Sequence, residues 1–537
     1  MPSSSKPAPD APPEIRRERP QSMAAQAVRG AFWTILSGTG GRVVGIVGTL
    51  AVTHYLSPAE YGEASVAALV TLTAGVFANL GISQYLAARP HAERVVVFHA
   101  TFWYLLLGVV ALVPVVVFQR SIGALLGTPA LGDYLPILVV STCLDRIAVV
   151  QDRIQVRDMR FRSVGIQRSL GELTYSVVSV ALAATCAGTR FGGGRALVWA
   201  MVARGVARLI FLFATTAWRD WAEPHRVTWA RTREFLGFGL PLSVLGIANF
   251  GSQRFDNFVY SHHYGEAAVG KYNLAYNFAD IPASLIADTV GDVLVPSFAH
   301  MESQERRKNA FLLALRILVL LVAPMAVGLA VVAPDLVGLA FPPSYDLALP
   351  LRILAMFAVP RTIIWTAVSY LQVGRDPRVL GMMELARMVG IVGVMHVTAL
   401  VARRVLGPEA AVAAACASVV AVFAASAFGY LLIIRKVDDV SLVDQLVPLV
   451  SPLLACAPMV LLILLLQQRL GRIAIFDVDQ PLLGFGARAA VHGPRLVLEI
   501  VAGALVFVPS ALLLAPTASR QLLGMLRAAA QRRRGIG

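Results

Sequence analysis

Residues 310–333, AFLLALRILVLLVAPMAVGLAVVA, form a long apolar run with a single charged residue, Arg316. As a helix, such a run is long enough to cross the hydrocarbon core of a bilayer, which takes about 20 residues. Hydrophobic residues make up 57% of the 537 residues and charged residues only 15%, against about 25% in ordinary globular chains. The mean hydropathy is +0.68. With so few charges a water-facing surface would carry large apolar patches, so the composition indicates an integral membrane protein.

Similar runs recur along the chain, and they predict an all-α polytopic membrane protein with about fourteen transmembrane helices. Twelve helices is the main alternative. A membrane β-barrel is excluded because its strands would show ten-residue alternation, whereas these runs are longer and continuous. We expect the spans near residues 32–55, 64–86, 96–118, 131–150, 164–188, 196–217, 236–260, 277–300, 310–333, 350–373, 379–402, 410–434, 446–467 and 496–516.

The net charge of +15 is distributed in short clusters between the spans. If the N-terminal tail is cytoplasmic, cytoplasmic segments hold 27 lysines and arginines and the opposite side holds 10. This bias predicts a multi-pass protein of the cytoplasmic membrane, the inner membrane where a cell has two, with both termini in the cytoplasm. Nucleic-acid binding is disfavoured because the basic residues do not form one face or stripe.

The spans and their connections predict the domain organisation. A disordered basic tail, 1–30, precedes an N-terminal six-helix bundle, 31–217, since the tail is rich in Pro, Ser and charge. A cytoplasmic linker, 218–235, leads to a C-terminal six-helix bundle, 236–436. Two additional helices, 437–517, and a basic cytoplasmic tail, 518–537, complete the chain.

Metal and cofactor sites are not expected. The four cysteines each stand alone in an apolar span, without the spacing of a metal site. We therefore expect free thiols, no metal and no cofactor. His262 and His263 are expected to be solvated at the periplasmic end of the seventh span.

A weak internal repeat relates the two halves. Residues 53–67, THYLSPAEYGEASVA, align with residues 261–275, SHHYGEAAVGKYNLA, at an offset of 208. The matches are His54/His262, Ala59/Ala267, Gly62/Gly270 and Ala67/Ala275; chance is the alternative, because alanine and glycine are common here. A true repeat predicts two bundles related by a pseudo-twofold axis along the membrane normal, an arrangement that suits alternating access.

The segment from Tyr55 to Gly62, YLSPAEYG, resembles the opening of the polysaccharide transporter branch of the multidrug/oligosaccharidyl-lipid/polysaccharide exporter superfamily. That family has an L-G-P-x-x-Y/F-G turn there, and this chain carries Ser57 in place of the first glycine. Residues 269–277, VGKYNLAYN, followed by Ile281 and Pro282, are similar to the start of the family's second half.

The resemblance covers roughly residues 25–520. It implies a Wzx-type flippase that moves undecaprenyl-pyrophosphate-linked oligosaccharides from the cytoplasmic to the periplasmic leaflet for surface polysaccharide biosynthesis (O-antigen, capsule or exopolysaccharide), and no enzymatic activity. Membrane lipids, a polysaccharide polymerase and chain-length or export proteins are further expected partners.

Two arginines within the spans are the candidate substrate-binding residues. Arg42 lies among small residues in the first span, and Arg254 lies in the seventh. The offset places Arg254 opposite Ile46, one helical turn from Arg42. A guanidinium binds phosphate through a planar fork, so two of them suit a pyrophosphate. Gln253 and Asp256 complete the expected set; the alternative is a structural pair with Asp256 or another buried acid.

Buried charges elsewhere in the spans allow several interpretations. Asp288 and Asp292, one turn apart in the eighth span, are candidates for ion coupling because neighbouring carboxylates in a low dielectric raise each other's pKa. Acids in the spans, Glu172 and Glu384 among them, could equally neutralise arginines. Eight further arginines are expected to snorkel or to pair between helices; they are Arg146, Arg168, Arg204, Arg208, Arg316, Arg352, Arg361 and Arg387.

Two other function classes remain open from the sequence. One is a cation-coupled small-molecule exporter of the same superfamily, although that branch usually has twelve helices. The other is a membrane polysaccharide polymerase or ligase, although such enzymes usually need a sizeable periplasmic loop, and the first such loop here offers only Glu60 and Glu63.

Overall fold

A computed structural model describes residues 40–79, 94–157, 160–216, 222–301, 303–373, 377–470 and 485–534. These residues are almost entirely helical, and none of them lies in a strand. The first described helix is Gly40–Val52, and the next six are α2 (Pro58–Phe77), α4 (Arg94–Val117), α5 (Gln119–Leu126), α6 (Leu131–Arg157), α7 (Phe161–Thr185) and α8 (Arg195–Thr215).

The second half begins with the longest helix, α10 (Trp229–Ala279). It is followed by α11 (Ile281–Ala299), α12 (Gln304–Ala340), α13 (Ala348–Leu354), a 3-10 turn at Ala355–Phe357, α14 (Ala358–Leu371), α15 (Pro377–Val405) and α16 (Pro408–Asp438). The chain ends with α17 (Leu442–Leu470), α18 (Phe485–Leu514) and α19 (Pro516–Arg534).

The helical membrane fold predicted from the sequence is confirmed. Eight described helices are long and apolar enough to cross a membrane. The number is nine if α5 and α6, between which the chain bends by 118°, form one broken span. The described parts of all fourteen expected spans are largely helical. The number of crossings stays a prediction, because helices such as α7 and α10, which cover expected spans, are not among these eight.

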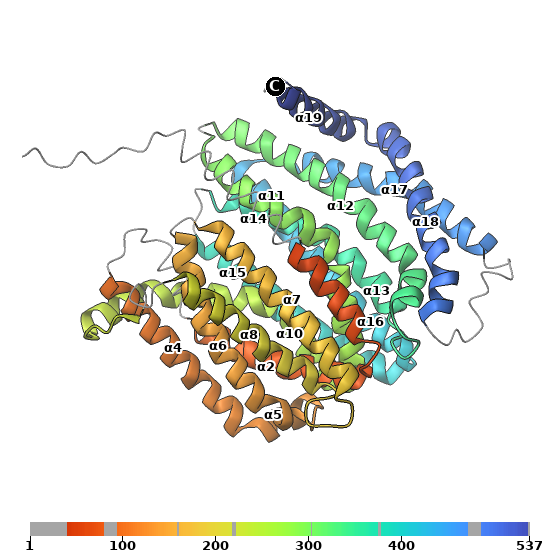
Figure 1. Cartoon of the computed structure of the whole chain (residues 1–537). Helices are drawn as coiled ribbons and strands as arrows, with labels where there is room; N and C mark the ends of the chain where they lie inside the picture. Colours follow the sequence, from red (N-terminus) through yellow and green to blue (C-terminus); the bar gives the residue numbers. More distant parts are fainter. Residues whose placement is uncertain are drawn as a thin grey trace, which may run out of the picture.

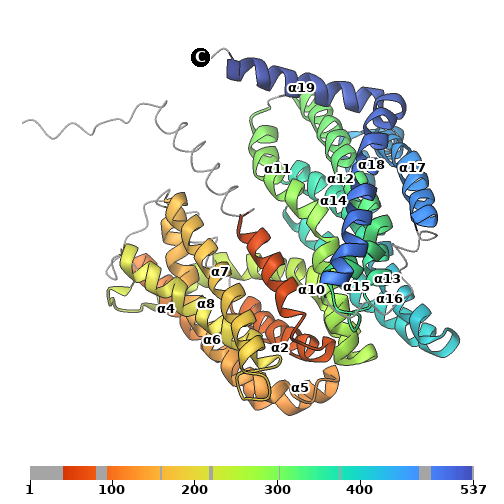
Figure 2. The ribbon, with the colours of Figure 1, turned by 45° about the vertical axis from the view of Figure 1, so that its right-hand side comes forward.

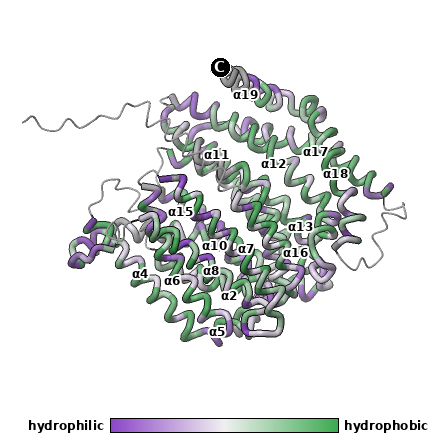
Figure 3. The backbone as a smooth tube through the Cα atoms, viewed as in Figure 1, coloured by the Kyte–Doolittle hydropathy of each residue, from purple (hydrophilic) through white to green (hydrophobic). Residues whose placement is uncertain are grey.

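The outer surface of the helices is apolar. Large side chains such as Val113 (54% exposed), Leu505 (70%) and Leu513 (78%) point away from the protein. Figure 3 shows hydrophobic residues along most helices, with hydrophilic stretches mainly toward helix ends. An exposed apolar surface this extensive requires lipid around it.

The helices form two groups with the first helix between them (Figures 1 and 2). Helices α2 to α8 pack together in one group, here called the N-terminal group, while α11 to α18 pack in the other, the C-terminal group. Helix α10 joins the groups because it packs against both α2 and α15. The domain boundaries expected from the sequence remain predictions.

Helix α2 begins where the YLSPAEYG segment predicts a turn. The Ser57 hydroxyl accepts a hydrogen bond from the Glu60 amide, and the Glu60 carboxylate accepts one from the Ser57 amide at 2.8 Å. Pro58 occupies the first helical turn, where its missing N–H costs nothing. Ser57, which replaces the glycine of the family pattern, therefore caps this helix.

Helix α10 continues past residue 260, where the seventh span was expected to end. Residues 261–276, expected to connect these spans, are helical, and the chain changes direction at Gly265, with φ 80° and ψ −179°. Only glycine adopts this conformation readily. A second break follows at Asp280, between α10 and α11. In place of the expected connecting loop, the chain therefore has two breaks, one at Gly265 and one at Asp280. The glycine redirects the helix without a loop.

The two repeated segments contact each other directly. A Cβ atom built on Gly62 would lie 1.9 Å from the carbonyl oxygen of Glu266, and one built on Gly270 would lie 2.2 Å from that of Pro58. Each contact is the other shifted by the offset of 208, and such a reciprocal pair is what a two-fold relation produces. The contact supports the repeat interpretation over chance.

Hydrogen bonds close the same end of the molecule. Ser261 Oγ donates to the Leu126 carbonyl at 2.6 Å, and a ring nitrogen of His262 contacts the Leu125 carbonyl at 2.6 Å. The α5 end of the N-terminal group is thereby held to α10. The main-chain contacts and these bonds together seal this end.

His263 is not solvated as expected. Its side chain is buried, and its Nε2 lies 2.8 Å from Nδ1 of His396 on α15. The kink places His263 in the C-terminal group, and sequence spacing alone does not reveal this.

The C-terminal region also differs from expectation. Residues 516–534, most of them in the expected basic tail, form helix α19. The four cysteines are free, as expected.

We predict that Gly62→Ala destabilises the closed end, because its methyl group has no space beside Glu266. Overpacking of this kind costs about 1–3 kcal/mol, so the melting temperature of the purified protein should fall. Gly246→Ala is the matched control, since nothing lies within 4 Å of a Cβ at this helical position. An equal effect of both substitutions would contradict the close contact.

Candidate functional site

A cavity of about 990 Å³ lies between the N-terminal group, the first helix and the C-terminal group. Residues from Gly40–Val52, α7, α8, α10, α11 and α14 line it. It is larger than two other cavities in the described part of the protein, which have volumes of about 190 and 380 Å³. Its volume is within the range of small-molecule sites, roughly 300–1,000 Å³.

Guanidinium groups dominate the polar lining. Four come from the first helix and the N-terminal group, and two come from α10 and α14. Among the described residues, two carboxylates, those of Glu172 and Asp280, line the cavity with them. The six are Arg42, Arg168, Arg204, Arg208, Arg254 and Arg361.

Close helix packing positions Arg42. Gly41 and Gly45 face Glu172 of α7, with Cβ positions 3.7 and 3.6 Å from its side chain, and Gly48 has no room for a Cβ beside Ser176. Three glycines on one face thus let the first helix approach α7 closely. The guanidinium of the exposed Arg42 lines the cavity beside this contact.

The arginines of α8 are anchored by Asp145 of α6. Arg208 lies 3.0 Å and Arg204 3.2 Å from its carboxylate, and Arg204 also lies 3.9 Å from Glu172. Gly171 on α7 makes room for both arginine side chains, since a Cβ there would lie 3.0 Å from Arg208 and 3.3 Å from Arg204. Asp145 therefore fixes two guanidiniums one helical turn apart on the same wall.

Arg168 and Gln167 extend this wall. Arg168 pairs with Asp152 at 2.8 Å. With its amide oriented to satisfy both neighbours, Gln167 donates to Asp152 at 3.0 Å and accepts from Arg208 at 2.9 Å. The N-terminal wall is thus one connected network of charge-assisted hydrogen bonds.

On the opposite wall, Arg361 of α14 pairs with Asp280 at 2.5 Å. Its guanidinium also lies 5.5 Å from the ring centre of Trp365. Asp280 is at the break between α10 and α11, so this pair holds the break against α14.

Arg254 is the exception among these arginines. It is half-buried, and among the described residues it makes no hydrogen bond or ion pair. It also lines a smaller chamber of about 190 Å³ together with Tyr61 and Asn273, toward the sealed end. Arg254 therefore lies between the main cavity and the closure.

The charges described at the site do not balance. Among the described residues, six guanidiniums face two lining carboxylates, and Asp145 and Asp152 behind the wall bring the described acids to four. A water-filled cavity enclosed by low-dielectric walls focuses this positive potential. The arrangement suits an anion, and the planar forks suit phosphate oxygens in particular.

The structure brings three of the four expected substrate-binding residues to this cavity: Arg42, Gln253 and Arg254. Asp256 is not among the lining residues. It is buried and accepts hydrogen bonds from Tyr272 at 2.5 Å and from Asn257 at 3.1 Å. The described geometry gives Asp256 a structural position in place of the expected ligand contact.

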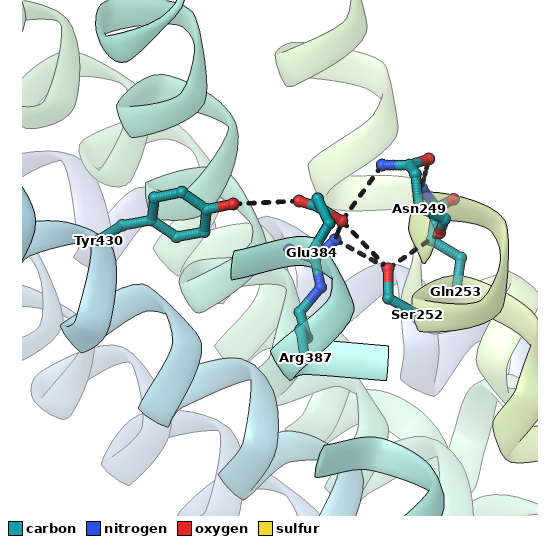
Figure 4. Close-up of polar contacts among 6 residues, drawn as sticks. All are labelled: Asn249, Ser252, Gln253, Glu384, Arg387 and Tyr430. Atoms are coloured by element: carbon teal, nitrogen blue, oxygen red, sulfur yellow. Dashed lines mark hydrogen bonds and ion pairs between the residues drawn. The ribbon is translucent and has the colours of Figure 1, made fainter. Parts of the chain in front are cut away.

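Gln253 connects the cavity to a buried polar cluster (Figure 4). Its amide donates to Asn249 at 3.0 Å, and Asn249 donates to Glu384 of α15 at 3.4 Å. Glu384 pairs with Arg387 and also accepts a hydrogen bond from Tyr430 of α16 at 3.1 Å. The cluster fixes this part of α10 against α15 and α16, so Glu384 neutralises an arginine.

The side chains of Asp288 and Asp292 lie outside the described residues, so ion coupling there stays a prediction. Arg146, in contrast, has a structural role. It donates to the carbonyls of Tyr104 at 2.9 Å and Gly75 at 2.7 Å.

Sequence analysis did not place Arg168, Arg204, Arg208 and Arg361 in the site. They do pair between helices as expected, yet they also line the cavity. One signal was available: Arg204 and Arg208 lie one turn apart on a single helix face, a costly placement unless that face meets water or acids.

Comparisons with known proteins agree with this geometry. A family model described as "Polysaccharide biosynthesis protein" matches residues 52–350. The chain belongs to this family. It is 26% identical over 519 residues to the succinoglycan biosynthesis transport protein ExoT of Rhizobium meliloti (strain 1021), covering 95% of this chain and 97% of that one. The lipopolysaccharide biosynthesis protein WzxC of Escherichia coli (strain K12) is 22% identical over 351 residues, covering 64% and 69%.

Solved structures place this member of the polysaccharide biosynthesis family in a known fold. The lipid II flippase MurJ in an inward closed conformation matches with a TM-score of 0.65 at 13% identity, covering 89% of this chain and 98% of that one. An outward-facing multidrug resistance MATE transporter of the MOP superfamily matches with a TM-score of 0.53 at 18% identity, covering 76% and 95%. The resemblance to the polysaccharide transporter branch of this superfamily is confirmed.

Asp256→Asn and Tyr272→Phe should each lower the melting temperature and leave ligand affinity unchanged, because their hydrogen bond is buried away from the cavity lining. A buried bond of this kind contributes about 1–3 kcal/mol. Tyr55→Phe is the control, since Tyr55 is 54% exposed. Weaker ligand binding at unchanged stability would instead return Asp256 to the binding site.

Proposed function

We propose that this protein is a flippase that translocates undecaprenyl-pyrophosphate-linked oligosaccharides from the cytoplasmic to the periplasmic leaflet. The observation that carries the proposal is the cavity with six guanidiniums between two groups of helices. Arg42 and Arg254 contact the pyrophosphate, and Gln253 contributes an amide beside it. The volume of about 990 Å³ leaves room for sugar residues next to the phosphates.

The transport route follows from the closed end. The cavity lies on one side of the Gly62–Gly270 contact, which blocks passage to the other side. Rocking the two groups of helices about this contact would close the cavity on one face and open it on the other. Because Arg254 lines both the cavity and the chamber near the closure, it stays with the phosphates as the route changes.

The cavity charge disfavours a small-molecule exporter for cations. Six guanidiniums would repel a cationic compound, and burying it among them would cost several kcal/mol. The MATE transporters share the fold alone at this level of identity. The relatives that align over most of the chain have names that refer to transport and to biosynthesis. The transport name of the relative aligned over 95% of the chain supports a transporter over a polymerase or ligase.

In this proposal the protein resides in the inner membrane with both termini in the cytoplasm. A polymerase and chain-length or export proteins receive its product in the periplasm. The biased distribution of lysine and arginine supports the orientation.

Arg42→Ala and Arg254→Ala should each impair translocation of a lipid-linked oligosaccharide in proteoliposomes. A lost charge-assisted hydrogen bond of about 1.5–3 kcal/mol corresponds to about 10- to 100-fold in affinity. Arg→Lys should impair transport only partly, since it keeps the charge and loses the fork. The double alanine variant should add little if both residues grip one pyrophosphate.

The control for these variants is Arg404→Ala, because Arg404 is exposed and outside the cavity lining. A structural role predicts another pattern: Arg42→Ala would lower the amount of folded protein, and removing an acidic partner as well would restore it. Normal transport by both single alanine variants would refute the assignment.

Cysteine labelling tests the orientation. In a cysteine-free background, Leu406→Cys in the exposed connection between α15 and α16 should react with a membrane-impermeant reagent in spheroplasts. Trp229→Cys, at the exposed start of α10, should react only after lysis. The reverse pattern would show that both termini face the periplasm.

A further inference from the structure

Helix α18 carries a buried polar stripe outside the cavity. Arg488, His492, Arg495 and Glu499 are spaced four, three and four residues apart, which places them on one face of the helix. All four are buried, while neighbours such as Val497 and Leu505 are exposed. A polar face this costly in a membrane helix is a candidate functional site.

Asp335 of α12 is the main partner of the stripe. Its Oδ1 lies 2.8 Å from Nδ1 of His492 and 3.3 Å from Nε of Arg495. Gly338, one turn further along α12, makes room for the imidazole, since a Cβ there would lie 2.5 Å from Nε2 of His492. The sequence thus keeps space for this histidine between the two helices.

Glu499 ends the stripe, and its surroundings do not suit a carboxylate. It is 0% exposed, and among the described residues no donor makes a hydrogen bond of good geometry to either carboxylate oxygen. Gln467 of α17 lies close by, but its amide donates to the Val331 carbonyl at 3.1 Å. Asp335, which contacts His492 and Arg495 of the same stripe, is also an acid.

Glu499 lies one helical turn beyond Arg495, whose Nε is 3.3 Å from Asp335, so both carboxyl groups face the same buried space between α12 and α18. If both were ionised, they would repel in a low dielectric, and Arg495 would have to offset both charges. If Glu499 is protonated, its hydroxyl donates to Asp335, and Asp335 keeps its contacts with His492 and Arg495. The protonated form is therefore the one that satisfies this site.

We propose that Glu499 is a proton-binding site, with Asp335 as the acceptor that holds its hydroxyl and His492 as the neighbouring titratable group. Loading the site transfers one proton from a hydronium ion to a Glu499 oxygen: the hydronium O–H bond breaks, water is released and a carboxyl O–H bond forms, without electron transfer. This site lies on other helices than Asp288 and Asp292 and does not depend on the identity of the transported molecule.

The stripe also provides a connection to water. Arg488, eleven residues before Glu499, donates to the Phe341 carbonyl, and its Nη2 lies 3.2 Å from Nε2 of the exposed His54. At about 1.5 Å per residue, the stripe spans about 16 Å from this exposed end to Glu499. His492 lies between the two and can pass a proton inward.

The test is infrared spectroscopy of the full-length protein in lipid nanodiscs as a function of pH. We expect the carbonyl-stretch band of a protonated, buried carboxyl at neutral pH. Glu499→Gln should remove this band, and Asp335→Asn should shift it because the acceptor changes from a carboxylate to an amide. Glu409→Gln, at an exposed acid in the first turn of α16, should leave it unchanged.

The absence of such a band in the wild-type protein, or its persistence in Glu499→Gln, would overturn the proposal. The amount of folded Glu499→Gln protein is a second test of the proposal. Glutamine mimics the neutral acid, so Glu499→Gln should fold normally if Glu499 is protonated. If it unfolds while Glu409→Gln is stable, Glu499 acts as a structural anion paired with Arg495, and the wild-type spectrum should then lack the band.

Discussion

A guanidinium inside a membrane must face water, a carboxylate or a ligand, and this constraint shapes the molecule. It stays charged at any accessible pH, and facing lipid would cost several kcal/mol. Six arginines meet this constraint at the cavity between the groups of helices, and four of them do so through carboxylates. Asp145 and Asp152 anchor three of them from behind, so these side chains are ordered before any ligand arrives. Such an ordered surface loses little entropy when it binds phosphate.

The sealed end uses a different kind of contact. The two groups meet there through the Gly62–Gly270 backbone contact and through hydrogen bonds from Ser261 and His262 to carbonyls. Neutral hydrogen bonds of this kind contribute only about 0.5–1.5 kcal/mol each, since water replaces them when they break. Among the described residues, no ion pair joins the two groups at this contact. Opening the contact therefore leaves no charge without its partner. Contacts that exchange readily with water suit an end that must open during transport.

A feature could be predicted from the sequence when it depended on residues close together along the chain, and not when it depended on contacts between distant helices. Apolar runs predict helices because hydropathy is local, and the offset of 208 pairs Gly62 with Gly270 through sequence similarity alone. Arg42 and Arg254 could be singled out because each stands alone in a span. The roles of Arg204 and Arg208 depend on Asp145, about sixty residues away, and sequence spacing does not show which helix faces meet. The hydrogen bond of Asp256 with Tyr272 could not be predicted for a related reason, since Tyr272 lies beyond the kink at Gly265.

The cavity and the polar stripe of α18 also differ in the sign of the charge that each lacks. Around the cavity, the described arginines outnumber the described acids, and in our proposal an anionic ligand completes the site. Along α18, Glu499 is buried without a hydrogen-bond donor among the described residues, and in our proposal a proton completes the site. The contact of Arg488 with His54 joins the stripe to the end of the first helix, and that helix carries Arg42. A change in the position of α18 on proton binding would therefore act on a helix that lines the cavity. Linkage then requires the reverse effect, in which anion binding at the cavity changes the proton affinity of α18.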